Sequence, residues 1–102
     1  MASVKELPIA ARKKIEKPEN WTQNYSAKDV DGSAVYVCSP EAVCWCTLGA
    51  IRAVSDDRGD LVEAACNKLY DVLDDSFITI FNDTHTHEEV LALFDRAIAN
   101  AH

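Results

Sequence analysis

Apolar residues recur at helical spacing in four stretches of the chain, and the first stretch runs from Ser3 to Lys17. Pro8 fits there only in the first turn, where a missing backbone N–H costs nothing, and Pro18 stops the helix. Residues at this spacing share one face of a helix. The apolar face of this first helix consists of Val4, Leu7, Ala11 and Ile15.

A second helix is predicted from Pro40 to about Val54. Its start, Ser39-Pro40-Glu41, supplies a side-chain cap, a proline at the first position and an acid at the positive end of the helix dipole. Apolar side chains cover nearly half of its circumference, so we expect this helix to be buried and central. Gly49 in its middle is expected to make room for the indole ring of Trp45 or for a neighbouring backbone.

Two further helices follow along the chain. Asp60 is expected to cap the third, which runs to about Leu73 and is closed by Asp74-Asp75-Ser76. The last helix begins at Thr86-His87-Glu88-Glu89, which has the spacing of a capping box. Its apolar stripe consists of Val90, Leu93, Phe94, Ala97, Ile98 and Ala101.

Two regions between the helices are predicted to be extended. The turn sequence Asp31-Gly32 separates Tyr25–Asp29 from Ala34–Cys38, which favours a two-stranded hairpin. The run Phe77–Phe81 is typical of a short buried strand. The predicted fold class is therefore α+β: four helices around a mostly buried second helix, with a small antiparallel β-hairpin and a short extended segment.

Composition and charge narrow the class of protein. The chain has 102 residues, of which 48% are hydrophobic, so we expect residues 1–102 to form a single globular domain. No apolar run approaches the roughly 18 residues of a membrane helix, and the first residues lack the apolar core of a secretory signal. A cytoplasmic protein is predicted, without membrane contact. The net charge of −7 argues against nucleic acid as a ligand, because phosphates require a cationic surface.

The four cysteines are expected to be free thiols that are mostly buried, as in a reducing cytoplasm. Their spacing fits neither a zinc ribbon nor the redox pair Cys-x-x-Cys. The sequence therefore predicts no disulfide, no metal site and no cofactor. The cysteines are Cys38, Cys44, Cys46 and Cys66.

Several short motifs occur in a characteristic order along the chain. They are Trp21-Thr22-Gln23, Ala27-x-Asp29-x-x-Gly32, Ala42-Val43-x-Trp45-Cys46-x-Leu48-Gly49-Ala50, Asn82-Asp83 and Glu89-Val90. This order resembles an uncharacterised family of small bacterial and phage proteins, over the stretch from Trp21 to about Ala97. The Trp-Cys-x-Leu-Gly-Ala block and the Asn-Asp pair are its most specific parts. Phe81 stands before that pair, where the family more often has Trp, and the resemblance assigns no catalytic residue.

Candidate chemistry lies near the start of the last helix. His85 and His87 stand beside Glu88 and Glu89, a composition that metal sites use, but residues two apart diverge on a helix. Exposed loop and first-turn positions are the simpler interpretation. Cys46 is either a core thiol or a nucleophile with His85 as its base, if the turn at residues 82–87 packs beside the second helix.

Two more features have both a structural and a functional interpretation. Asn82-Asp83 precedes a helix start, where free backbone N–H groups attract ligands, although these residue types also stabilise turns. Trp21 lies in a polar loop and either covers the edge of the core or faces a partner.

Three functions compete on this evidence. The first is a non-catalytic accessory or protein-interaction module, whose partner is another protein or a second copy of the chain. The second is a small-molecule-binding protein or minor enzyme with a cleft formed by Trp21, Trp45, Cys46, Asn82, Asp83 and His85. The third is an acidic mimic of nucleic acid that uses Asp56, Asp57, Asp60, Asp71, Asp74 and Asp75.

Overall fold

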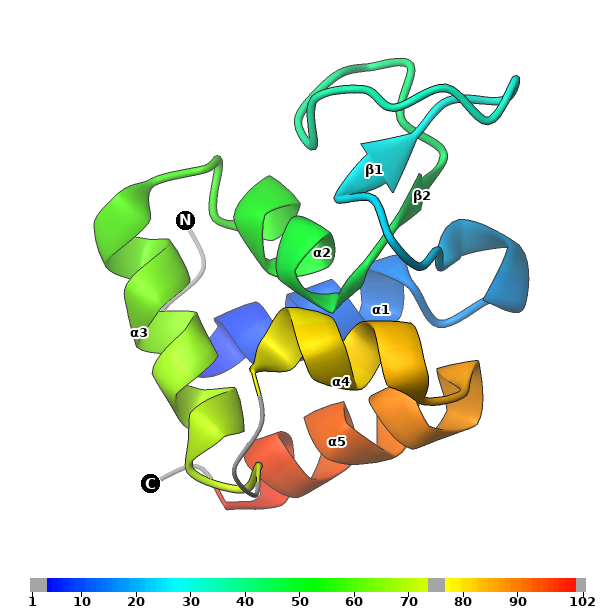
Figure 1. Cartoon of the computed structure of the whole chain (residues 1–102). Helices are drawn as coiled ribbons and strands as arrows, with labels where there is room; N and C mark the ends of the chain where they lie inside the picture. The colour runs from blue at the N-terminus through cyan, green and yellow to red at the C-terminus, as the bar shows by residue number, and fades with distance from the viewer. Residues whose placement is uncertain (1–3, 74–76, 101–102) are drawn as a thin grey trace.

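The structure, a computed structural model, describes residues 4–73 and 77–100. Over these residues the chain forms five α-helices and a two-stranded antiparallel sheet (Figure 1). This confirms the predicted α+β class, with one more helix than expected. The helices are α1 (Leu7–Lys14), α2 (Thr47–Val54), α3 (Gly59–Tyr70), α4 (Ile78–Thr84) and α5 (His87–Ala99). Short 3-10 turns η1 (Val4–Glu6) and η2 (Pro18–Asn20) flank α1, and the strands are β1 (Ala27–Lys28) and β2 (Cys44–Trp45).

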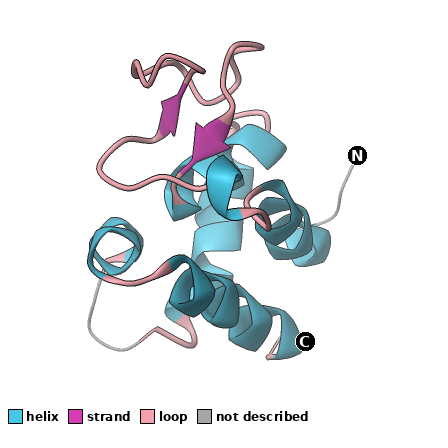
Figure 2. Cartoon of the chain, turned by 90° about the vertical axis from the view of Figure 1, so that its right-hand side faces the viewer, coloured by secondary structure: helices cyan, strands magenta, loops and turns pink. Residues whose placement is uncertain are grey.

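The hydrophobic core lies between the helices and draws on all five of them. Helix α2 contacts α1, α3 and α4, as expected of a central element. The sheet and the long loops lie together at one end of the molecule, beside the helical part (Figure 2). No helix in the described part of the chain is long and apolar enough to cross a bilayer. The largest fully buried apolar side chains are Leu7, Ile15, Ile51, Leu69, Ile78, Val90, Leu93 and Phe94.

The predicted hairpin forms only in part. Its turn is present, with the N–H of Gly32 donating to the carbonyl of Asp29 (3.0 Å), and an antiparallel bridge joins Lys28 to Ala34. The N–H of Val35 also donates to the carbonyl of Ala27 (3.1 Å). The strand that pairs with β1 in the sheet is β2, with Ala27 opposite Trp45. Further along the loop Val37 is buried, and its carbonyl accepts the indole N–H of Trp45 (2.9 Å).

The predicted second helix begins later than its sequence suggests. Ser39 caps only a turn, in which its hydroxyl accepts the N–H of Glu41 (3.1 Å), since serine and proline serve turns as well as helix starts. The next residues are extended in β2, where the N–H of Cys46 donates to the carbonyl of Ser26 (3.2 Å). Cys46 is therefore the N-cap of α2, and the expectation that it lies in mid-helix is wrong.

The predicted strand Phe77–Phe81 is wrong as well, because these residues begin helix α4. Ile78 and Asn82 are both buried, whereas Ile80 between them is 52% exposed. In a strand all three would lie on the same face, so this pattern is helical. A short apolar run cannot by itself distinguish the two periods.

The remaining helix predictions agree with the structure apart from their ends. Pro8 lies in the first turn of α1, and the capping box between Thr86 and Glu89 forms in both directions (3.2 and 2.9 Å). The cap of α3 is Arg58, whereas Asp60 was expected there, and the helix ends before Leu73. The expected helix start at Ser3, the stop at Asp74-Asp75-Ser76 and the stripe residue Ala101 lie outside the described residues.

Gly49 allows the loop before β1 to lie directly on helix α2. A Cβ atom at this position would overlap the carbonyl group of Ser26. Of the two expectations for this glycine, the neighbouring backbone is the correct one, and the indole of Trp45 is not what needs the space.

We predict that Gly49→Ala lowers the free energy of unfolding by about 1–3 kcal/mol, because overlap with a fixed backbone outweighs the better helix propensity of alanine. Gly59→Ala is the matched control, since a Cβ at this first residue of α3 would meet nothing within 4 Å. Urea unfolding of both variants measures the difference. Equal stability of the two variants would contradict the close approach at Ser26.

Candidate functional site

The side chain of Asn82 is fully buried and joins three parts of the fold. Its Oδ1 accepts the indole N–H of Trp21 (2.7 Å), the backbone N–H of Thr47 (2.9 Å) and the hydroxyl of Thr47 (2.8 Å). Its Nδ2 donates to the carbonyl of Thr22 (3.0 Å) and to Oδ1 of Asp83 (3.0 Å). The amide thus fixes α4 against the start of α2 and against the loop that begins at Trp21.

That loop is tied to the end of α4 along much of its length. The side-chain amide of Gln23 donates to the carbonyls of Asn82 (3.1 Å) and His85 (3.0 Å). The backbone N–H of Asn24 donates to Oδ1 of Asp83 (2.8 Å), and Asn24 has a left-handed backbone (φ 70°), which asparagine tolerates better than most residues. We call residues 21–26 the strap segment.

A cleft of about 160 Å³ lies where the strap segment meets α4. Cys46 is the buried residue in its lining, whereas Tyr25, Thr79 and Asp83 are exposed. The cleft therefore has a thiol at its inner end and an open rim that carries one carboxylate. Its lining residues are Asn24, Tyr25, Ser26, Cys46, Thr79 and Asp83.

The thiol of Cys46 is held in its protonated form. Its Sγ caps α2 by accepting the N–H of Gly49 (3.2 Å), a contact that favours the thiolate. Burial outweighs this contact and raises the pKa of Cys46 above its ordinary value of 9.0, and the nearby carboxylate of Asp83 raises it further. A protonated thiol is a poor nucleophile, so the geometry favours a structural cap.

The imidazole of His85 does not contact this thiol in the described part of the chain. Its ring stacks on Phe81 with centroids 3.8 Å apart, and Nδ1 lies 2.9 Å from the Phe81 carbonyl and 3.0 Å from the hydroxyl of Thr84. His85 therefore joins the site through its backbone carbonyl alone, and a Cys46–His85 nucleophile and base pair is not assembled.

Of the six residues of the predicted cleft, two line it, two form a network behind it, and the rings of Trp45 and His85 belong to neither group. Cys46 and Asp83 line the cleft, and Asn82 and Trp21 form the network behind it. Trp45 lies elsewhere, with its indole on the Val37 carbonyl and the ammonium of Lys14 4.2 Å from the ring centroid. Trp21 is half-buried and packs against the core, so it closes the core edge.

His87 also makes contacts with neighbouring residues. Nε2 of His87 lies 2.6 Å from the carbonyl of Ile15, and its ring packs on Trp21 (5.5 Å between centroids). Among residues 4–73 and 77–100 no group of three or more His, Cys, Asp or Glu side chains is placed to hold a metal ion. The cysteines Cys38, Cys44, Cys46 and Cys66 are all free.

Sequence reasoning missed four of the six cleft residues, namely Asn24, Tyr25, Ser26 and Thr79. Thr79 and Asp83 are four apart, so they share a helix face, but this signal is hidden when Phe77–Phe81 is interpreted as a strand. Tyr25 stands in a loop whose position depends on residues far away along the chain. One example is the hydrogen bond between Asn24 and Asp83, which are 59 residues apart.

A second polar cluster fixes the long loop between the strands. Asp57 accepts two bonds from the guanidinium of Arg52 (2.8 and 3.1 Å) and one from the hydroxyl of Tyr36 (2.8 Å). These bonds lower the pKa of Asp57 to about 2, and the bond to Asp57 raises the pKa of Tyr36 to about 12. The charge of Asp57 is thus neutralised within the fold, which weakens the acidic-mimic hypothesis. Two other residues of that set, Asp74 and Asp75, lie outside the described residues.

Comparison with known proteins assigns the chain at the level of family. A model of a family of unknown function, DUF6197, matches residues 1–100. The chain belongs to this family. The match confirms the expectation of an uncharacterised family and extends beyond the residues that suggested it. No curated protein and no solved structure matches the chain significantly. Membership in DUF6197 assigns no functional residue.

We predict that Asn82→Ala lowers the free energy of unfolding by about 2–4 kcal/mol, because buried donors on Trp21 and Thr47 lose their acceptor. Asn67→Ala, an exposed position on α3, is the control and should stay within about 0.5 kcal/mol of the parent. Chemical unfolding followed by circular dichroism gives both values. If the two variants unfold alike, Asn82 does not hold the site together.

The raised pKa of Cys46 predicts that its thiol reacts slowly with alkylating agents at neutral pH. In a chain with Cys38→Ser, Cys44→Ser and Cys66→Ala, the alkylation rate of Cys46 by iodoacetamide should reach half its maximum above pH 9.0. Because the folded chain keeps this proton to higher pH than the unfolded chain, the free energy of unfolding should fall as pH rises past that value.

Asp83→Asn removes a negative charge beside the thiol, so it should lower the pKa of Cys46 and speed alkylation at about pH 8. Asp71→Asn at the end of α3 is the control and should leave the rate unchanged. A half-maximal rate below pH 9.0 would contradict a protonated cap and return Cys46 to the list of candidate nucleophiles.

Proposed function

We propose that the protein is a non-catalytic protein-interaction module of the cytoplasm, and that α4 and the strap segment form its interaction surface. The partner we propose is a different protein, since two copies that each carry a net charge of −7 repel one another. The bacterial or phage origin that the resemblance implies is part of this proposal.

The size of the cleft is the observation that carries the proposal. Sites for small molecules typically enclose roughly 300–1,000 Å³, whereas a cavity of roughly 150 Å³ holds a single benzene ring. A cleft of about 160 Å³ therefore suits one amino-acid side chain better than a free metabolite or a cofactor. A side chain of this kind is delivered by a partner polypeptide.

The surface beside the cleft is apolar and exposed. Thr79 and Asp83 face the cleft from α4, and Ile80 comes next around the helix. Ile80 is 52% exposed, and Tyr25 on the opposite rim is 51% exposed. Aromatic and aliphatic side chains around a pocket that accepts an anchor residue are typical of the centre of a protein interface. We call Tyr25 and Ile80 the apolar rim.

The alternative of a minor enzyme receives less support from the same residues. Nucleophilic chemistry at Cys46 requires a thiolate and a base, but burial keeps the thiol protonated and the ring of His85 contacts Phe81. The cleft is better explained by recognition than by reaction.

The proposal predicts that Ile80→Glu abolishes partner binding, because a charge in the apolar rim would have to be desolvated on association. Ile9→Glu is the matched control, since Ile9 is an equally exposed isoleucine (48%) on α1. The measurement is affinity capture from the native cell with each variant as bait, followed by a direct binding titration with the purified partner.

Both variants should fold with the parent's stability within about 0.5 kcal/mol, because each replaces an exposed side chain. The expected result is one partner that the parent and Ile9→Glu bind and Ile80→Glu does not. A partner bound equally by all three chains, or lost equally from both variants, would show that the apolar rim is not the interaction surface.

A further inference from the structure

Asp83 presents a fixed carboxylate at the cleft with one oxygen still available. Its Oδ1 accepts the N–H of Asn24 (2.8 Å) and the amide of Asn82 (3.0 Å). Neither these bonds nor the ion pairs of the described residues, which involve Arg12, Arg52 and Arg58, occupy Oδ2. Because Asn82 is itself buried and fully bonded, the carboxylate is held in place before any ligand arrives.

Among the side chains that line the cleft, the carboxylate of Asp83 is the one that carries a full charge. Cys46 is a protonated thiol, and the remaining lining side chains carry amide, hydroxyl or phenol groups. A fixed anion in a small cleft is matched by a cationic donor, since hydrogen bonds between charged groups are about twice as strong as neutral ones. The net charge of −7 also attracts a cation to this surface.

The ring of Tyr25 adds a second contact for a cation. The ammonium of Lys28 already lies 4.7 Å from its centroid, so the ring position suits a positive charge on one face. Half of the Tyr25 side chain remains exposed at the cleft rim. Lys28 itself repels a second cation, and the carboxylate of Asp83 on the opposite wall offsets that repulsion.

We infer that the cleft binds the cationic side chain of a lysine or arginine that belongs to the partner protein. This inference rests on the proposed function and specifies its ligand: the head group bonds Oδ2 of Asp83, and the aliphatic stem packs against Tyr25. Lysine would bond as a point charge, and arginine would also stack its planar guanidinium on the ring. Both heads share the chemistry that the carboxylate recognises.

The test uses three small probes of similar length: N-acetyl-arginine methylamide, N-acetyl-lysine methylamide and the neutral N-acetyl-norleucine methylamide. Each is titrated into the folded full chain, and the amide resonances of Asn24, Thr79 and Asp83 are followed by NMR. At least one basic probe should give saturable shifts at these residues. The norleucine probe should give none over the same concentrations.

Asp83→Asn is the decisive variant because its side-chain oxygen can still accept from Asn24 and Asn82 while the charge is lost. This variant should bind the basic probe with an affinity roughly threefold to tenfold lower than that of the parent. Asp71→Asn should leave the affinity for the probe unchanged. Raising salt from about 50 mM to about 500 mM should weaken binding as well. Equal binding of the norleucine probe, or no loss in Asp83→Asn, would overturn the inference.

The result can be separated from that of the proposed function. Ile80 does not line the cleft, so Ile80→Glu should still bind the basic probe although it no longer binds the partner. If a basic probe binds but no partner depends on Ile80, the cation site is retained and the interaction module is refuted. A partner that depends on Ile80, without binding of either basic probe, would refute the cation site alone.

Discussion

Asn82 places a primary amide where no water can reach it, and the arrangement around it depends on satisfying that amide. An unbonded buried amide costs several kcal/mol, so the geometry that supplies its five bonds is strongly preferred over any that does not. Apart from its neighbour Asp83 on α4, its partners come from the strap segment and from the first residue of α2. The amide therefore specifies how three chain segments meet, which apolar contacts alone would leave variable.

The cleft follows from a second constraint that acts on the same segments. Gly49 lets the backbone at Ser26 rest on α2, and the N–H of Cys46 bonds the Ser26 carbonyl there. The far end of the strap segment is thus fixed to α2, while its beginning is fixed to α4 by Asn82 and Gln23. Tyr25 lies between these two attachments, on the side where α4 presents Thr79 and Asp83. The side-chain-sized space is what remains between the two attachments.

Local signals in the sequence were sufficient where a helix is defined by its own residues. The capping box of α5 and the proline in the first turn of α1 are both read from neighbouring residues, and both are present. The start of α2 could not be found this way, because Cys44 and Trp45 are extended through pairing with Ala27 and Lys28, far back in the chain. Helix α4 was missed because Asn82, a polar residue, completes the buried face that begins at Ile78. The sequence indicated Cys46, Asn82 and Asp83, but the residues opposite them depend on tertiary contacts.

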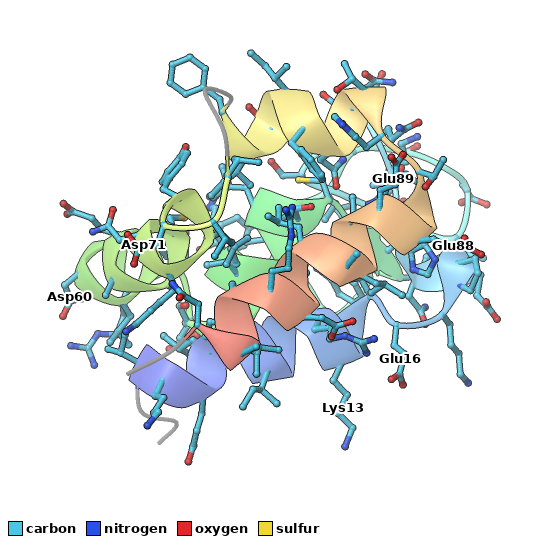
Figure 3. All side chains as sticks on the ribbon, turned by 90° about the horizontal axis from the view of Figure 1, so that it is seen from below. Lys13, Glu16, Asp60, Asp71, Glu88 and Glu89 are labelled. Atoms are coloured by element: carbon cyan, nitrogen blue, oxygen red, sulfur yellow. The ribbon has the colours of Figure 1, made fainter. Side chains whose placement is uncertain are left out.

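The distribution of charge supports the same surface independently of the cleft. The chain has 17 acidic and 10 basic residues, yet Asp83 is the single charged residue of α4. The charged residues labelled in Figure 3 belong to other helices or lie next to them, with Lys13 on α1, Asp60 on α3 and Glu88 on α5. Charged side chains are depleted at the centres of protein interfaces, since each must lose its water there. A helix that keeps one fixed carboxylate and otherwise exposes Ile80 beside threonines fits the interface that we propose, with Asp83 as the charge that would bind the inferred cation.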